Sequence, residues 1–129
     1  MTVAAGIEIH APVDGYGEAW NAHDLDVIMS FHAEDGTHCL HVDREREHGT
    51  DEIREAFGSY LTEWPDMHFE RRRMLVGDGL FVHEMLVTPT ADGKSVAFPM
   101  VDVITVRDGE MVDKDTYCDV TMAPRQAAS

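Results

Sequence analysis

The stretch VDVITVRDGEMV, residues 101–112, sets an Asp-Gly pair between two apolar segments. Asp-Gly flanked by hydrophobic residues is a strong local signal for a β-hairpin. We predict strands over 95–106 and 111–122 on either side of this pair, and two earlier strands over 67–76 and 80–88. The connections at 77–79 and 91–93 are short and glycine-containing, so these strands should be antiparallel neighbours. A shorter strand is predicted over 37–42.

Helical patterns occupy the first half of the chain. The spacing of Val13, Tyr16 and Trp20 predicts a helix from Pro12. Asp24 should cap a second helix, whose apolar face is Leu25, Ile28 and Phe31. Thr50 is the expected N-cap of a third helix, which Pro65 ends and whose apolar stripe is Ile53, Phe57, Tyr60, Leu61 and Trp64. Helices followed by a strand meander predict an α+β architecture, with the helices on one face of a curved sheet.

Composition limits the classes of function. The 129 residues fit one domain over 1–129, with loose ends at 1–11 and 124–129. With 25 acidic and 10 basic residues the net charge is −15, which disfavours binding to nucleic acids and to membranes. No apolar run reaches the ~20 residues of a spanning helix. Residues 1–10 lack the basic region of a signal peptide, so we expect a cytoplasmic protein with Cys39 and Cys118 as thiols.

Three segments together resemble the NTF2-like superfamily, which includes the SnoaL-like polyketide cyclases, ketosteroid isomerases and limonene-epoxide hydrolases. They are residues 16–26 with 31–37, residues 49–54, and residues 101–112 with 117–119. The resemblance spans about residues 12–122. It implies a cone in which a bent, mostly antiparallel sheet wraps three N-terminal helices around one apolar pocket. It also implies a homodimer through the outer face of the sheet.

Tyr16 and Asp102 are the first two candidate catalytic residues. Tyr16 lies on the apolar face of the first helix, and a buried tyrosine needs a partner for its hydroxyl. Asp102 interrupts an apolar strand, and alternation from Ile104 and Val106 places it on their inward face. The resemblance to ketosteroid isomerases implies that both residues stabilise an enolate oxygen. Core packing of Tyr16, or pairing of Asp102 with a buried donor, are the alternatives.

The position of the isomerase base is occupied by Leu40, which cannot take a proton. His38, two residues earlier on the same strand face, could act as base or acid instead. His83 and Glu84 are adjacent in an apolar strand, so only one of them can face the pocket. Counting from Gly79 slightly favours Glu84, and a slip of one residue would favour His83. Each could equally be a structural or surface residue.

Metal and nucleophilic sites find little support in the sequence. His38, His41, Asp43 and His48 cluster, but they divide between two strand faces and no CxxC or HExxH accompanies them. Arg71–Arg73 form the one basic run, which a strand would also divide between its faces. Asp113, Asp115 and Asp119 should lie on the outer face, with Val112, Thr116 and Cys118 opposite. An acidic outer face in a dimer would need partners such as the Arg71–Arg73 run.

These patterns lead to a cofactor-independent enzyme, with no metal, that moves protons on a hydrophobic cyclic or carbonyl-bearing small molecule. The expected reaction is an isomerisation, cyclisation or dehydration. The alternatives are a non-catalytic binding or assembly domain, favoured by Leu40, and an epoxide hydrolase, disfavoured because Thr116 stands where the family has an aspartate. The expected pocket wall is Trp20, Leu40, Phe57, Tyr60, Phe98, Ile104, Thr116 and Cys118.

Overall fold

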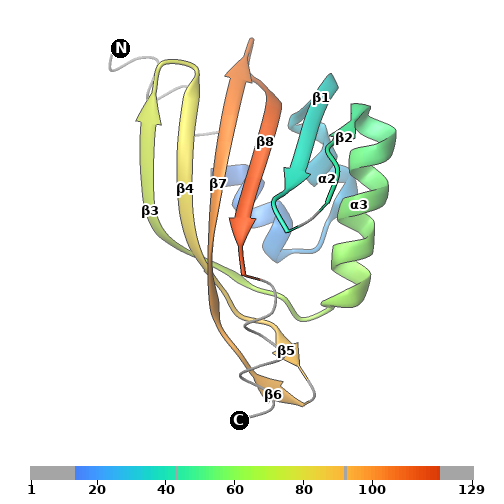
Figure 1. Ribbon diagram of the computed structural model, residues 1–129, viewed down its shortest axis with the longest axis vertical. Helices are drawn as coiled ribbons and strands as arrows, with labels where there is room; N and C mark the ends of the chain where they lie inside the picture. The colour runs from blue at the N-terminus through green and yellow to red at the C-terminus, as the bar shows by residue number, and fades with distance from the viewer. Residues whose placement is uncertain (1–13, 43, 92, 120–129) are drawn as a thin grey trace.

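The computed structural model describes residues 14–42, 44–91 and 93–119 (Figure 1). The predictions that rest on Pro12, Val13, Asp43, the two loose ends and a last strand beyond residue 119 lie outside the described residues. A first helix occupies residues 14–21. The other elements are α2 (Leu25–Ser30), β1 (His32–Leu40), β2 (Glu47–His48), α3 (Gly49–Glu63), β3 (Phe69–Gly77), β4 (Leu80–Val87), β5 (Thr90–Ala91), β6 (Lys94–Ser95), β7 (Phe98–Arg107) and β8 (Glu110–Cys118).

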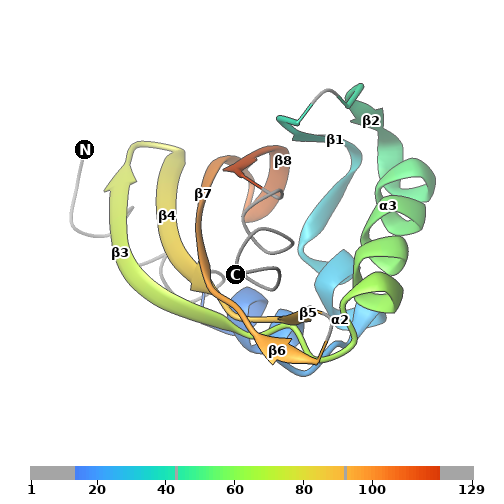
Figure 2. The same ribbon diagram turned by 60° about the horizontal axis from the view of Figure 1, so that its bottom comes forward.

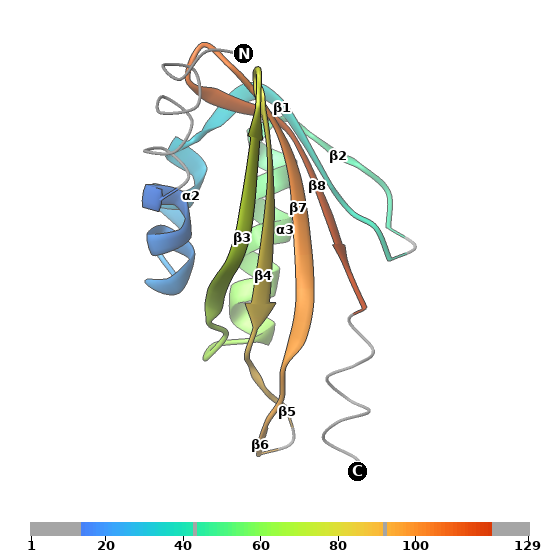
Figure 3. The ribbon, with the colours of Figure 1, turned by 90° about the vertical axis from the view of Figure 1, so that its left-hand side faces the viewer.

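Six strands form one sheet in the order β2-β1-β8-β7-β4-β3, and β5 and β6 form a separate hairpin. All neighbours in the large sheet are antiparallel except β1 and β8, which are parallel. The sheet curves strongly from β3 to β1, and α3 lies at the β1 end (Figure 2). Seen from the side, the β5–β6 hairpin extends from the end of β4 and β7 that lies away from the β3–β4 turn (Figure 3). The predicted α+β fold, three helices against a curved and mostly antiparallel sheet, is confirmed.

Two strands begin three or more residues away from their predicted starts. The first strand begins at His32 rather than Thr37, and it ends at Leu40. The predicted strand over 95–106 is divided, because Ser95 pairs back on Thr90 in the small hairpin and β7 begins only at Phe98. The N–H of Val96 donates to the carbonyl of Pro89, so the chain folds back on itself before it joins the main sheet.

Of the two predicted N-cap residues, Asp24 is confirmed and Thr50 is wrong. Asp24 caps α2 as predicted, because its carboxylate accepts a hydrogen bond from the N–H of Val27. Thr50 does not cap α3; the N-cap is His48, and the carboxylate of Glu52 accepts from the N–H of His48 at 3.1 Å. Glu52 supplies the acceptor from within the first turn, so no hydroxyl is needed in front of it.

The core lies between the inner face of the sheet and the helices. Ile28, Ile53, Phe57, Phe81 and Val87 are essentially inaccessible to solvent. Burial of each such side chain is worth roughly 1.5–3 kcal/mol relative to exposure. The helices and the inner face of the sheet also border a cavity next to this core.

None of the helices in the described part of the chain has the length and apolar character needed to cross a membrane.

Candidate active site

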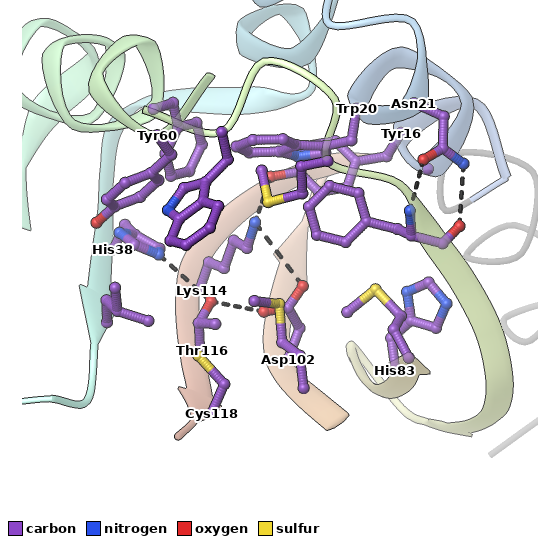
Figure 4. Close-up of a pocket in the computed structure, with 18 of the residues that line it drawn as sticks. Tyr16, Trp20, Asn21, His38, Tyr60, His83, Asp102, Lys114, Thr116 and Cys118 are labelled. Atoms are coloured by element: carbon purple, nitrogen blue, oxygen red, sulfur yellow. Dashed lines mark hydrogen bonds and ion pairs between the residues drawn. The ribbon is translucent and has the colours of Figure 1, made fainter. Parts of the chain in front are cut away.

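A cavity of about 680 Å³ opens between the inner face of the sheet, the first helix and α3. Of the expected wall, the cavity contacts all residues but one: Trp20, Leu40, Phe57, Tyr60, Phe98, Thr116 and Cys118. Ile104 is the exception. Its placement in the pocket wall was wrong, because it is 1% exposed and packs in the core instead. Among the candidate catalytic residues, Tyr16, His38, His83 and Asp102 line the cavity (Figure 4).

The register of the sheet aligns four cavity-lining side chains in one row. Leu40 on β1 pairs with Thr116 on β8, Thr116 pairs with Asp102 on β7, and Asp102 pairs with His83 on β4. Residues directly opposite each other on neighbouring strands point to the same face. The row therefore carries a hydroxyl, a carboxylate and an imidazole across the pocket wall, and Leu40 closes it at one end.

Lys114 lies at the centre of the site, and the sequence analysis did not identify it. Its ammonium nitrogen is 2.9 Å from the Tyr16 hydroxyl and 3.8 Å from Oδ2 of Asp102 (Figure 4). The same nitrogen lies 4.8–4.9 Å from the ring centres of Tyr16, Trp20 and Phe57. Three aromatic faces stabilise a cation at this distance. Alternation back from Thr116 and Cys118 was a signal that could have placed Lys114 in the pocket.

The environment of Lys114 holds it in the charged form. Burial favours the neutral amine, but Asp102 and Tyr16 outweigh burial and raise the pKa of Lys114. An ammonium group donates hydrogen bonds and has no lone pair for nucleophilic attack. Lys114 is therefore suited to stabilise negative charge rather than to form an imine.

His32 is the second residue that the sequence analysis missed. Its Nε2 lies 2.9 Å from the hydroxyl of Tyr16. Burial, assisted by the charge of Lys114, lowers the pKa of His32 to about 3, so its imidazole is neutral. Burial also raises the pKa of Tyr16, with Lys114 opposing, so Tyr16 keeps its proton. Together Lys114, Tyr16 and His32 form a line of hydrogen bonds along one side of the cavity.

A second line of hydrogen bonds starts at Asp102. The hydroxyl of Thr116 donates to Oδ1 of Asp102 at 2.5 Å, and Nε2 of His38 lies 3.3 Å from the same hydroxyl oxygen. On the other side of the imidazole, Nδ1 lies 2.9 Å from a carboxylate oxygen of Glu47. Burial and the charge of Lys114 lower the pKa of His38 to about 2. His38 is thus a neutral imidazole with both nitrogens in hydrogen bonds.

His83, and not Glu84, is the titratable residue of β4 that faces the cavity. His83 is 6% exposed and receives a hydrogen bond from Nε of Arg71 at 3.3 Å. Glu84 points to the outer face, where it pairs with Arg73 at 3.4 Å. The slight preference for Glu84 was wrong, because the count from Gly79 began one residue out of phase. Burial lowers the pKa of His83, which keeps it neutral.

The remaining polar candidates lie outside the reacting centre. His41 bonds to Asp115 on the outer face while His38 points inward, and the described residues contain no group of three metal-ligating side chains. Arg71 faces the cavity and Arg73 does not, so the basic run is divided, but by a register shift between these two residues rather than by the expected alternation. Val112, which was expected on the inner face, is half-buried and is the unpaired residue of a register shift, and Met111 is the buried residue at this end of β8.

Cys118 lines the cavity, and both Cys118 and the buried Cys39 are free thiols. Burial, with Asp102 adding to it, raises the pKa of Cys118 to about 11. A thiol with this pKa is almost entirely protonated at neutral pH and is a poor nucleophile.

Residues 13–114 match the SnoaL-like domain family. The chain belongs to this family. Solved structures share the fold across nearly the full chain. A putative SnoaL-like polyketide cyclase from Jannaschia has a TM-score of 0.83 and 17% identity, and the match covers 98% of this chain and 94% of that one.

Two other solved structures widen the comparison. A putative polyketide cyclase from Xanthomonas campestris pv. campestris has a TM-score of 0.78 and 22% identity, with 93% and 96% of the two chains covered. A protein with a ketosteroid isomerase-like fold from Catenulispora acidiphila, in complex with trimethylamine, has a TM-score of 0.82 and 17% identity, with 91% and 92% covered. No curated protein matches the chain. At these identities the likeness establishes the fold of this SnoaL-like protein and not its reaction.

Proposed function

We propose that this SnoaL-like protein is an enzyme that moves a proton on a hydrophobic, carbonyl-bearing small molecule, in an isomerisation, cyclisation or dehydration. The observation that carries the proposal is the meeting of Lys114, Tyr16 and Asp102 in one largely apolar cavity, with polar atoms 2.9–3.8 Å apart. A cation next to a carboxylate in such a cavity provides one group for developing negative charge and one group for the proton.

In the proposed reaction, the substrate carbonyl oxygen lies against Lys114 and Tyr16. A carboxylate oxygen of Asp102 takes a proton from the carbon next to that carbonyl. The C–H bond breaks, an O–H bond forms on Asp102, and the electron pair moves to the carbonyl oxygen as an enolate. The ammonium group of Lys114 stabilises that oxyanion, and it does so more strongly in a water-poor cavity than it would in bulk water.

Tyr16 can assist only if its own proton is available. When the proton of His32 is on Nε2, the hydroxyl oxygen of Tyr16 accepts from both His32 and Lys114. The O–H of Tyr16 is then left to donate to the enolate oxygen. The buried indole N–H of Trp20 also has no hydrogen-bond partner among the described residues, and a polar group of the ligand would satisfy it.

These roles replace those implied by the isomerase resemblance. There Tyr16 and Asp102 both stabilise the oxyanion, and another residue removes the proton. Here Lys114 lies between Tyr16 and Asp102, so the carboxylate is better placed to take the proton and the ammonium to hold the oxygen. Asp102 can return the same proton at a second carbon, and His83, its neighbour in the row, is a neutral imidazole that can hydrogen-bond to the substrate there.

The test is deuterium exchange at the carbon next to a carbonyl, because it detects proton transfer without knowledge of the natural substrate. We would follow 2-tetralone and a Δ5-3-ketosteroid in D₂O by proton NMR. The wild-type protein should accelerate exchange, and Asp102→Asn should reduce the rate by about 10²–10⁴-fold, the usual contribution of a general base. Lys114→Met should show a comparable loss.

Glu84→Gln is the matched control, since Glu84 neighbours His83 in sequence but lies on the outer face. It should exchange at the wild-type rate. A parallel titration with 2-naphthol, whose absorption reports its ionisation, measures whether the pocket favours an oxyanion. No exchange by the wild type, with 2-naphthol bound only as the neutral phenol, would contradict the proposal.

That outcome would favour the alternative, a domain of the same fold that binds a small molecule without chemistry. Leu40 supports this alternative, because the end of the polar row that could hold a second carboxylate is apolar. An epoxide hydrolase gains less support, since Thr116 donates its hydroxyl to Asp102 where a second aspartate would be needed.

A further inference from the structure

We propose that Glu47, His38 and Thr116 form a proton relay that connects Asp102 in the cavity with the outside of the molecule. The proposal rests on the proposed function, in which Asp102 takes a proton from the substrate and that proton can exchange with solvent before it is returned. It names a pathway, and a terminal residue, for that proton.

The relay is continuous in the structure. Asp102 Oδ1, Thr116 Oγ1, the imidazole of His38 and Glu47 Oε1 follow one another at 2.5, 3.3 and 2.9 Å. Figure 4 shows its inner half, where His38, Thr116 and Asp102 lie side by side along the cavity wall. His38 is 2% exposed, so it has no direct contact with bulk water.

The two ends of the relay lie in different environments. Asp102 lines the main cavity, whereas Glu47 borders a separate surface hollow together with Glu52, Glu55, Ala56 and Ser59. The side chain of Glu47 is 17% exposed, so water can reach its carboxylate from that hollow. His38, packed edge-on against Phe57, separates the two spaces.

The transfer balances without a charged histidine. When Asp102 is protonated, its O–H donates to Thr116, the Thr116 O–H turns to Nε2 of His38, and Nδ1–H donates to Glu47. Three protons then shift together: from Asp102 to Thr116, from Thr116 to Nε2, and from Nδ1 to Glu47. Asp102 is again a carboxylate, Glu47 is an acid, and His38 has changed only its tautomer.

A tautomer shift suits the surroundings of His38. An imidazolium at this site would be buried near Lys114, Arg46, His32 and His41, which together with burial lower the pKa of His38. Around Glu47 the charged groups are Arg44, Arg46 and Glu52, and burial raises the pKa of its carboxyl. Glu47 is therefore a better proton acceptor than an exposed glutamate.

The first test needs no substrate. Nitrogen-15 shifts distinguish a ring nitrogen that carries hydrogen from one that does not. In the wild type, His38 should stay neutral and change its dominant tautomer as Glu47 titrates. In Glu47→Gln the tautomer should be fixed at every pH, and in Glu55→Gln, a carboxylate on the same hollow, it should behave as in the wild type. A single tautomer in the wild type at all pH values, or an imidazolium, would overturn the relay.

The second test measures turnover. Glu47→Gln and Thr116→Val should lower kcat for deuterium exchange by tenfold or more while KM for 2-tetralone stays within twofold, and Glu55→Gln should match the wild type. Exchange by the wild type that Glu47→Gln leaves unchanged would overturn the relay and leave the proposed function standing. A tautomer shift as predicted, with no exchange by the wild type and with 2-naphthol bound only as the neutral phenol, would retain the relay and refute the proposed function.

Discussion

At the scale of single residues, Lys114 decides the chemistry of the pocket. A fully buried ammonium loses its hydration, at a cost of several kcal/mol. Here the Tyr16 hydroxyl, the Asp102 carboxylate and three aromatic faces offset that cost. A buried charge with a specific partner in a cavity is a candidate for a functional residue, because its burial is costly.

Removal of Lys114 should leave Asp102 as a buried charge without its cation. We predict that Lys114→Met lowers the free energy of unfolding at pH 7 by about 3–5 kcal/mol. Lys114→Met combined with Asp102→Leu should recover much of that loss, because the unpaired carboxylate is gone. Urea denaturation of the two single variants and the double variant gives the coupling energy.

The matched control is Arg54→Met. Arg54 pairs with Asp26 on the surface, where both side chains are largely exposed. Loss of this exposed pair should cost less than about 1 kcal/mol. Equal effects at Lys114 and Arg54, or no recovery in the double variant, would show that Lys114 and Asp102 are not coupled in the folded protein.

The sequence could place Asp102 and Thr116 on the inner face because alternation is unbroken where residues 100–105 of β7 pair with residues 113–118 of β8. Lys114 follows the same alternation, yet lysine is so rarely buried that the residue type argues against its position. Only the three-dimensional contact with Asp102 resolves that conflict. Alternation failed for His83 and Glu84, because a count that starts one residue too early or too late assigns every side chain of the strand to the wrong face.

At the scale of elements, the parallel pairing of β1 with β8 places His38 and Leu40 next to Thr116, and so positions both the proton relay and the row of side chains across the pocket wall. The register between the two strands shifts between His32 and Thr37, where Gly36 lies. A β-carbon on Gly36 would lie 3.0 Å from the carbonyl oxygen of Ala33 and 3.1 Å from that of Val112. Both are backbone atoms, which cannot move aside without displacing a strand. The early start of β1 was not predictable, since Phe31–Gly36 lack strand alternation.

We therefore predict that Gly36→Ala is destabilising by about 1–3 kcal/mol, the usual cost of overpacking. It should also shift the resonances of His32 and His38, which lie on either side of the irregular stretch. Gly17→Ala is the control, because a β-carbon there meets no atom within 4 Å and a helical alanine is favoured by about 0.5–1 kcal/mol. Thermal unfolding followed by circular dichroism measures both. A stable Gly36→Ala would mean that β1 and β8 approach less closely than described.

At the scale of the whole molecule, the net charge of −15 belongs mainly to the outer surfaces. Asp113 and Asp115 lie on the outer face of β8, bonded to Thr37 and to His41 and Arg46. At the buried centre of the site, the charges of Lys114 and Asp102 lie beside neutral histidines. Composition could therefore predict which macromolecules the surface repels, but it could not predict the charge inside the cavity.

The buried neutral histidines connect the site to the stability of the whole fold. The pKa values of His32 and His38 lie at about 3 and 2 in the folded protein, against a usual value of about 6.5. Between pH 6.5 and about 3 the unfolded chain binds protons at both positions and the folded protein does not. Stability from these groups is therefore complete above pH 6.5 and is lost as the pH falls through that window.

Each such histidine should contribute about 1.4 kcal/mol per pH unit to the slope of the free energy of unfolding between pH 6 and 4. Acid neutralises surface carboxylates over part of the same range, so the absolute slope mixes several groups. The difference between variants isolates the histidine. His32→Gln, which can still bond to Tyr16, should reduce the slope by about one proton, as measured by urea midpoints at a series of pH values. His68→Gln, at an exposed position, is the matched control. An unchanged slope in His32→Gln would mean that His32 is protonated in the folded protein. The hydroxyl of Tyr16 would then lie between two cations, and its role as an oxyanion donor would need a different arrangement of protons.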